Sequence, residues 1–352
     1  MRWSDIIGQE GAVCLLRRAL GAGRLSQALL FSGPAGVGKR TTARTLAAAL
    51  LCPARGLADE ACGTCPSCLL SRCGGHPDFH VPLAVERGDR KKRVEDWAPA
   101  RAVSDEDRQI AVDTVRYLMH QVGLRSSSGG PKVALIPRAE RMNESAQNAL
   151  LKGLEEPPGG LVWILTSEDP TGLLPTVRSR AMRVRFGRIP TGALASALTG
   201  AAGGATARSD AVALAEAAEG SFLRAEALRS EDWTAERAHL EKTAMPHVGA
   251  GRRAGPALAE ALIARLAAVS KSAPKAETEG LEGTRRPALR MLEVLARLVR
   301  DRMRESLAAG PSAACEWARR LEVVLASDAA IRQNVRAELA LAVAAARLAR
   351  PW

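Results

Sequence analysis

The sequence predicts an α/β protein in which a parallel sheet domain is followed by helices. Short apolar runs alternate with helical patterns between residues 28 and 187, and this alternation is typical of a parallel sheet. A glycine-rich turn at 33–41 lies between the first apolar run and a helical segment. Beyond Pro190 the chain is rich in Ala, Leu and Arg at helical spacing, which predicts a helical remainder.

The overall composition limits the possible classes of protein. A chain of 352 residues is long enough for about two or three domains with cores of their own. No apolar run reaches the roughly 18 residues of a membrane-spanning helix, and the N-terminus lacks a signal peptide's hydrophobic region, so we expect a cytoplasmic protein. The net charge of +12 permits a polyanionic partner such as DNA. Only 3% of the residues are aromatic, which argues against a base-stacking platform.

Hydrophobic spacing places the expected elements along the chain. An amphipathic helix is expected within residues 1–27, ahead of the turn. Buried strands are expected at 28–31, 133–136 and 161–165, followed by a short strand at 182–186. Helices are expected at 42–51, about 110–119, 145–155 and, in two or three pieces, 288–350. Residues 270–287 are rich in Lys, Ser, Pro, Glu and Gly, which predicts a loop between helices.

The glycine-rich turn has the pattern of a phosphate-binding P-loop. Gly33, Gly38 and Lys39 complete G-x-x-x-x-G-K, in which backbone N–H groups hold phosphate oxygens and the lysine reaches the outer phosphates. The next residue should offer a hydroxyl to magnesium, but it is Arg40. Thr41 is no simple substitute, because one residue along a helix turns a side chain by roughly 100°. The candidate nucleotide-binding residues of the loop are Gly33, Gly36, Gly38 and Lys39.

A second departure follows the second buried strand. In a P-loop ATPase this strand ends in acidic residues that hold magnesium and polarise the attacking water. Here the residues are Pro137 and Arg138, and Glu140 lies beyond the strand end. Together with Arg40, these residues predict that magnesium is neither bound nor used. Nucleotide binding without cleavage stays open, since the glycines and Lys39 would still form an anion-binding nest.

Five of the seven cysteines lie between residues 52 and 73. In a cytosolic chain such crowding indicates a metal site rather than disulfides. Two C-x-x-C steps share Cys65, and Cys52 can complete a tetrahedral thiolate site for structural zinc. An iron–sulfur cluster that uses Cys73 is the rival, but the spacing from Cys68 does not match the usual ferredoxin run. Unliganded buried cysteines are a third possibility. The predicted zinc ligands are Cys52, Cys62, Cys65 and Cys68.

Polar residues fill the stretch between the cysteines and the next predicted helix. His76 and His80 could bind a metal in principle, but we expect them in the loop that leads to the next strand. Residues 86–108 are strongly charged, which predicts a solvated surface insertion.

Several motifs follow one another in a fixed order along nearly the whole chain. The P-loop and the cysteine cluster are two of them. The others are D-I-I-G-Q-E at 5–10, G-H-P-D at 75–78, N-A-L-L-K-G-L-E-E-P-P at 148–158 and L-P-T-V-R-S-R at 174–180. The runs at 148–158 and 174–180 are together highly specific. With these motifs the chain resembles the AAA+ clamp-loader subunits of bacterial DNA polymerase III.

The resemblance implies three domains and a set of partners. It implies an AAA+ P-loop domain at 1–187 with a zinc module at about 52–80, a small helical lid at 188–243 and an all-helical collar at 244–352. The collar of such subunits joins a five-membered ring. The implied partners are the tau/gamma and delta subunits and, through the complex, the sliding clamp and primer–template DNA.

The resemblance also assigns two arginines. In such loaders the arginine of a Ser-Arg-Cys motif reaches the γ-phosphate held by the neighbouring subunit and stabilises its charge. Here the motif reads Ser179-Arg180-Ala181, so Arg180 is the implied arginine finger. Arg178 is the nearest competitor, and a surface ion pair is the simpler role for Arg180. Arg224 matches the second sensor arginine of the lid.

The departures at the P-loop select between members of the family. A motor subunit should keep Ser or Thr after Lys39 and acids after the second strand, so this chain resembles the member that has lost hydrolysis. Residues 330–341 also resemble the end of that member's collar. One alternative is an active motor that holds magnesium through Thr41 or Glu140. Another is a DNA-binding module that acts alone through its basic surface.

Overall fold

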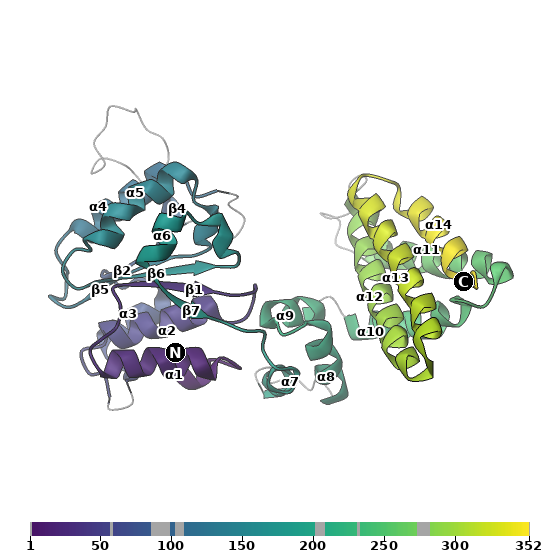
Figure 1. Ribbon diagram of the computed structural model, residues 1–352, viewed down its shortest axis with the longest axis horizontal. Helices are drawn as coiled ribbons and strands as arrows, with labels where there is room; N and C mark the ends of the chain where they lie inside the picture. The colour runs from purple at the N-terminus through teal and green to yellow at the C-terminus, as the bar shows by residue number, and fades with distance from the viewer. Residues whose placement is uncertain are drawn as a thin grey trace. The chain divides into compact units, whose positions relative to one another are not determined.

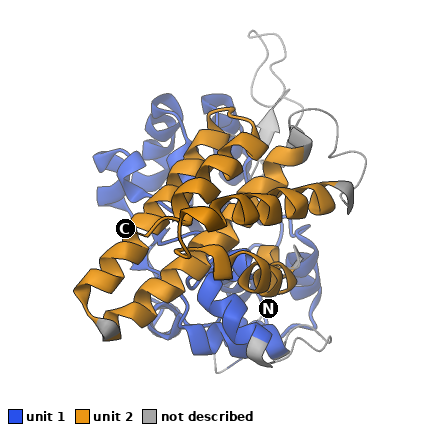
Figure 2. Ribbon diagram, turned by 90° about the vertical axis from the view of Figure 1, so that its right-hand side faces the viewer, with its two compact units in different colours: residues 1–225 blue, residues 226–352 orange. Residues whose placement is uncertain are grey.

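The chain forms two compact units in the computed structural model, residues 1–225 and 226–352 (Figure 2). The structure describes residues 2–56, 59–85, 99–102, 109–200, 208–230, 233–272 and 282–351. Most of the predicted charged insertion at 86–108 therefore lies outside the described residues.

A five-stranded sheet lies at the centre of the first unit in the part of the chain that the structure describes (Figure 1). Its order is β2-β5-β6-β1-β7, and every pairing is parallel. Strands β1, β5 and β6 are buried along their whole length, which is why they read as continuous apolar runs. The strands are β1 (Ala28–Ser32), β2 (Phe79–His80), β5 (Lys132–Ile136), β6 (Leu161–Ser167) and β7 (Met182–Arg185). A separate antiparallel pair consists of β3 (Leu83–Val85) and β4 (Pro99–Ala102).

Helices cover both faces of the sheet. Alternate side chains of a strand point to opposite faces, and β1 accordingly contributes Leu29 and Phe31 to one hydrophobic cluster and Ala28 and Leu30 to another. The first cluster includes residues of α1 and α2, and the second includes residues of α4 and α5. Figure 1 shows α1 and α2 on one side of the sheet and α4 and α5 on the other. The helices of this part are α1 (Glu10–Gly21), α2 (Lys39–Leu51), α3 (Pro66–Cys73), α4 (Val112–Gly123), α5 (Glu144–Glu155) and α6 (Pro175–Arg180).

Local sequence sets the ends of α5, which carries one of the functional motifs. The Oδ1 atom of Asn143 accepts a hydrogen bond from the N–H of Ala146 at 2.8 Å, so Asn143 caps the start of the helix. The helix ends at Glu155, because Pro157 disfavours helical geometry in the residue before it. The helix was predicted at 145–155, and it begins one residue earlier, at Glu144.

The rest of the described chain is helical, as predicted. It contains α7 (Thr191–Gly200), α8 (Arg208–Ala217), α9 (Phe222–Ser230), α10 (Trp233–Thr243), α11 (Gly255–Ser272), α12 (Glu282–Ser306), α13 (Pro311–Arg332) and α14 (Ala337–Leu348). None of the helices in the described ranges is long and apolar enough to cross a lipid bilayer. The predicted loop at 270–287 is wrong at both ends, because α11 runs to Ser272 and α12 begins at Glu282 with Pro287 inside it.

The predicted fold class is confirmed. A parallel α/β sheet is present, the four-cysteine cluster follows α2 in the connection from β1 to β2, and helices follow the sheet. The division into three domains at 187 and 243 stays a prediction. The two compact units meet in sequence within α9, between Ala225 and Glu226.

Candidate functional site

The P-loop connects β1 to α2 with two glycines in left-handed backbone geometry. Gly36 has φ 71° and Gly38, which caps α2, has φ 98°, so larger residues would be strained at both positions. A Cβ atom at Gly36 would also lie 2.1 Å from the Oγ atom of Ser221. The loop is therefore in close contact with the turn that begins α9, and the N–H of Phe222 donates to the carbonyl of Gly36 at 2.9 Å.

Lys39 points back onto its own loop. Its Nζ atom donates to the carbonyls of Gly33 at 2.6 Å and Pro34 at 2.5 Å, and the residue is 8% exposed. Burial lowers the pKa of Lys39 below its usual value, opposed by the nearby carboxylates of Glu168 and Glu140. The ammonium group is thus occupied by backbone oxygens of the loop.

The residues that follow Lys39 on α2 place their side chains differently. Arg40 and Thr41 are exposed, whereas Thr42 is fully buried. The Thr42 hydroxyl donates to the carbonyl of Gly38 at 2.9 Å. The helical turn of about 100° per residue separates these side chains, as expected from the sequence.

A guanidinium lies at the end of β5, where an active P-loop ATPase has an acid. Arg138 has φ 47°, and its Nη2 atom is 3.1 Å from the Oε1 atom of Glu168, which follows β6. The N–H of Arg138 donates to the hydroxyl of Thr166 at 3.1 Å. Glu140 accepts a hydrogen bond from the N–H of Glu168 at 3.1 Å. These contacts place one guanidinium, paired with Glu168 and close to Glu140, at the carboxyl end of the central strands.

Arg180 is the last residue of α6 and lies on the surface. Its Nη1 atom donates to the carbonyl of Thr176 at 3.1 Å, and its Nη2 atom is 2.6 Å from the Oε1 atom of Glu155. The side chain is 36% exposed. Arg178, the competing candidate, is also exposed. Arg180 therefore does make the surface ion pair that was the simpler alternative, and it still presents part of its guanidinium to solvent.

Arg224 lies in the first turn of α9, next to the P-loop contact. Its Nη1 atom is 4.0 Å from the Oε2 atom of Glu219, and its side chain is 42% exposed. The N–H of Arg224 donates to the Oγ atom of Ser221 at 3.3 Å. Ser221 thus touches both the P-loop and the backbone of the candidate sensor residue.

The four predicted zinc ligands come together in one cluster. The Sγ atoms of Cys52, Cys62, Cys65 and Cys68 all lie within 4.8 Å of one another. The Cys52–Cys65 and Cys62–Cys68 sulfur separations are 3.9 and 3.8 Å. Zinc–sulfur bonds of about 2.3 Å at tetrahedral angles place sulfurs about 3.8 Å apart. Cys73 is exposed and outside this cluster.

Backbone N–H groups point at the cluster's sulfurs, and such contacts stabilise thiolates. The N–H groups of Cys62, Cys65 and Cys68 each lie 3.4 Å from the sulfur of another cysteine in the cluster. N–H groups of Thr64 and Cys65 lower the pKa of Cys62 to about 6, whereas burial raises the pKa of Cys68 to about 12. A dication would stabilise all four thiolates together. The residues therefore fit a structural zinc ion, which would hold α3 and the preceding loop to the end of α2.

His76 is not a metal ligand in this arrangement but joins the cysteine module to the sheet. Its Nε2 atom is 2.9 Å from the Oγ atom of Ser67, which donates to the carbonyl of Leu51 at 2.8 Å. Its Nδ1 atom accepts from the N–H of Asp78 at 3.1 Å. Burial lowers the pKa of His76, which favours the neutral ring that these bonds need. No sequence pattern predicts this bridge, since Leu51, Ser67 and His76 come from separate segments.

Asp78 of the same motif fixes the loop before β5. It is 2% exposed, and its carboxylate accepts from the N–H groups of Ser127 and Ser128 at 2.8 and 3.1 Å and from the Ser128 hydroxyl at 2.7 Å. Burial alone would raise the pKa of Asp78, but these hydrogen bonds outweigh it and lower the pKa below its usual 3.8.

Asp78→Asn is expected to destabilise the fold by about 1–3 kcal/mol at pH 7, because two N–H groups and one hydroxyl lose a charged acceptor. A folded pKa below the unfolded one stabilises the protein above the unfolded value, and this stability is lost as the pH falls through the folded pKa. The difference between wild type and variant should therefore shrink below about pH 4. Urea unfolding of both proteins at pH 7 and pH 3.5 measures this difference in the free energy of unfolding. An equal difference at the two pH values would contradict the role given to the Asp78 carboxylate.

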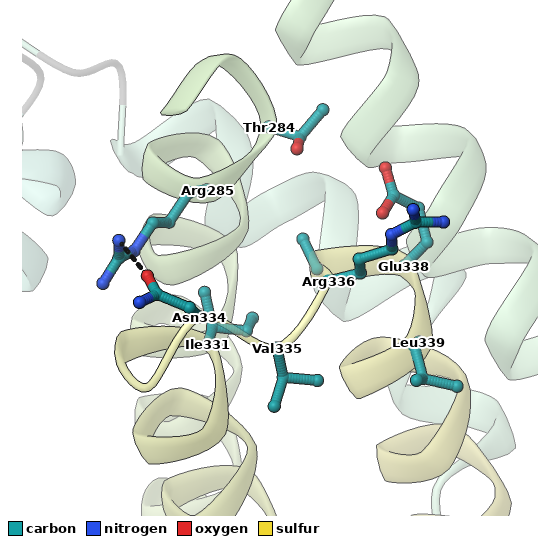
Figure 3. A pocket seen from close by; sticks show the side chains of 9 residues that line it. Thr284, Arg285, Ile331, Asn334, Val335, Arg336, Glu338 and Leu339 are labelled. Atoms are coloured by element: carbon teal, nitrogen blue, oxygen red, sulfur yellow. Dashed lines mark hydrogen bonds between the residues drawn. The ribbon is translucent and has the colours of Figure 1, made fainter. Parts of the chain in front are cut away.

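A pocket of about 730 Å³ lies in the second unit, where α12 begins and where α13 is followed by α14 (Figure 3). Arg285 donates to the Oδ1 atom of Asn334 at 2.9 Å and to the carbonyl of Arg332 at 2.7 Å, and thereby caps the end of α13. Ile331, Val335 and Leu339 contribute apolar side chains to the lining. The remaining lining residues lie on α12, on the segment that joins α13 to α14 and at the start of α14.

The sheet order, the P-loop and the cysteine cluster define a P-loop protein of the AAA+ type. A family model described as DNA polymerase III, delta subunit, matches residues 8–190. The chain belongs to this family. The match covers the sheet, the P-loop, the cysteine cluster and α6.

Named relatives support the same family. The delta' subunit of DNA polymerase III from Pseudomonas aeruginosa is 42% identical over 163 residues, 46% of this chain and 44% of that protein. The gamma/tau subunit from Mycobacterium tuberculosis is 35% identical over 188 residues, 53% of this chain and 29% of that protein. The chain thus matches less than half the length of these relatives.

Solved structures match the chain at low identity. A DNA polymerase III gamma subunit-related protein from Thermotoga maritima covers 95% of this chain and 98% of its own, with 16% identity and a TM-score of 0.44. A RuvB mutant from the same organism covers 68% and 67%, with 17% identity and a TM-score of 0.40. Similarity at this level carries no information about activity.

Proposed function

We propose that this chain is the non-hydrolysing delta-prime subunit of a DNA polymerase III clamp loader. In this proposal it scaffolds a five-membered ring with tau/gamma and delta subunits, and it donates Arg180 in trans to the ATP site of a neighbouring subunit. The ring would load the sliding clamp onto primer–template DNA during replication. The predicted lid at 188–243 and collar at 244–352 belong to the same proposal.

The observation that carries the proposal is Arg138, which occupies the end of β5 in an ion pair with Glu168. Hydrolysis in a P-loop ATPase needs a metal held at this strand end and an acid that orients the attacking water. A guanidinium can do neither, because it is a permanent cation without a basic atom. The chain's own loop is therefore expected not to cleave ATP.

The P-loop geometry supports the proposal. The ammonium of Lys39 bonds the carbonyls of its own loop, and the N–H of Phe222 bonds Gly36. A nucleotide would have to displace at least the lysine contacts before its phosphates could be held. Binding without cleavage remains compatible with this geometry, because the glycine backbone that forms an anion nest is retained.

The alternative is an active motor subunit, and one observation favours it. The Oε2 atom of Glu140 is buried without a hydrogen-bond partner among the described residues, and the Glu140 carboxylate acts on the pKa of Lys39. A buried, unpaired carboxylate oxygen near the P-loop lysine could in principle hold a metal. Glu140 follows the strand end, however, and its Oε1 atom is engaged by the N–H of Glu168.

Lys39→Ala separates the two functions. In a reconstituted clamp loader we expect the variant subunit to leave DNA-stimulated ATP hydrolysis unchanged within about twofold, because a subunit without a metal site contributes no turnover. Substitution of the P-loop lysine in the motor subunit is the positive control. A loss of turnover attributable to this chain with Lys39→Ala, reproduced by Glu140→Gln, would establish the motor function instead.

A further inference from the structure

Glu155 and Arg180 form an ion pair between two motifs that the sequence analysis treated separately. The pair joins the last residue of α5 to the last residue of α6 at 2.6 Å. A second contact, from the Nη1 atom of Arg180 to the carbonyl of Thr176, fixes the same guanidinium at 3.1 Å. Both contacts hold one edge of the guanidinium, and the side chain is 36% exposed.

The two helices that carry the pair are fixed to each other and to the sheet. Gln147 of α5 is 4% exposed, and its Oε1 atom accepts from the N–H of Leu174 at 2.7 Å, immediately before α6. Near the other end of α5, the indole N–H of Trp163 in β6 donates to the carbonyl of Gly153 at 2.8 Å. Glu155 is therefore presented from a buried and hydrogen-bonded frame.

Stabilisation of α5 does not explain why this helix ends in a glutamate. An acidic side chain at the C-terminal end of a helix is disfavoured by the helix dipole, and an exposed ion pair adds little to folding. The same pair does limit the motion of a long arginine side chain. Charge-stabilising groups are most effective when they are already oriented toward the developing charge.

We propose that Glu155 is a positioning residue for Arg180. It holds the guanidinium at the surface of this chain, with the N–H groups that the contacts to Glu155 and Thr176 do not use directed toward a phosphate bound by the neighbouring subunit. The inference rests on the proposed function, because it requires Arg180 to act in trans. The opposite role, a lock that withholds Arg180, makes the opposite prediction, since removal of a lock raises turnover.

The test is a double-mutant cycle in the reconstituted clamp loader. Complexes are assembled with full-length chains carrying no substitution, Glu155→Gln, Arg180→Ala or both. We expect Glu155→Gln to lower the kcat for DNA-stimulated ATP hydrolysis about two- to fivefold with the KM for ATP unchanged, which is the range of an exposed ion pair. In the Arg180→Ala background, Glu155→Gln should have no further effect.

Glu156→Gln is the matched control, because Glu156 is the adjacent exposed carboxylate. It should leave kcat unchanged, and thermal unfolding of each isolated chain checks that the fold is retained. A kcat for Glu155→Gln equal to or above wild type overturns the proposal, as does an equal loss in the Arg180→Ala background. If Arg180→Ala itself has no effect, the proposed function fails and this inference fails with it.

Discussion

Arg180→Ala is expected to lower ATP hydrolysis at the adjoining site of the ring by about 10³-fold, the lower range for loss of an arginine finger. A finger stabilises charge that develops on the transferring phosphoryl group, so its removal should reduce kcat rather than nucleotide affinity. The protein offers Arg180 from the surface, 36% exposed and fixed by Glu155 and the carbonyl of Thr176. Ring assembly should be unaffected, because α6 is buried through Val177 rather than through Arg180.

The measurement is DNA-stimulated ATP turnover in a complex whose other finger arginines are already substituted, so that the adjoining site dominates the signal. Arg178→Ala is the matched control. Arg178 and Arg180 are two positions apart on the helix, which places their side chains about 200° apart. Arg178→Ala should therefore leave turnover intact. Equal losses for the two variants would remove the assignment of the finger to Arg180, and unchanged turnover with Arg180→Ala would remove the role in trans.

Arg180→Lys should recover little of the lost activity. A lysine keeps the charge but not the planar set of N–H donors that can bind a phosphate and a carboxylate at the same time. Wild-type activity with lysine would indicate a simple charge effect.

The sheet could be predicted because its central strands are buried on both faces. Residues of β1, β5 and β6 read as uninterrupted apolar runs, and their predicted bounds differ from the observed ones by at most two residues. The edge strand β2 was missed. It contains only Phe79 and His80, which is too short for any periodicity.

The helical character of the part beyond Pro190 was predicted, but the bounds of α11 and α12 were not. Pro287 and its polar neighbours indicated a loop, yet α12 begins five residues before the proline. The buried face of this helix starts at Ala288 and continues through Leu292, Leu295 and Val299. Packing of that face outweighs the loss of one backbone hydrogen bond near the start of the helix.

The candidate site could be predicted where residues are close in sequence and not where they are distant. The four cysteines follow one spacing rule, and they form the expected cluster. The Glu155–Arg180 pair, the contact of Phe222 with Gly36 and the Arg138–Glu168 pair each join separate elements. The order of strands in the sheet brings these residues together, and no local pattern encodes that order.

The cysteine cluster is expected to hold about one zinc ion per chain by elemental analysis, and Cys65→Ser should remove it. Cys65 contributes to both C-x-x-C steps, and its sulfur accepts the N–H of Cys68 at 3.4 Å. The apparent binding free energy of structural zinc in small modules is about 10 kcal/mol or more. This is on the order of the whole free energy of unfolding of a domain. Loss of the ion should therefore unfold the module.

The unfolding should stay local. Leu51 and Phe79, on either side of the module, belong to the hydrophobic core of the sheet, but none of the four cysteines does. Hydrogen exchange should become fast between residues 52 and 73 in Cys65→Ser and remain slow in β1, β5 and β6. Cys73→Ser is the matched control, because Cys73 is exposed and outside the cluster. Retention of zinc in Cys65→Ser, its loss in Cys73→Ser, or iron with visible absorbance would each contradict a four-cysteine zinc site.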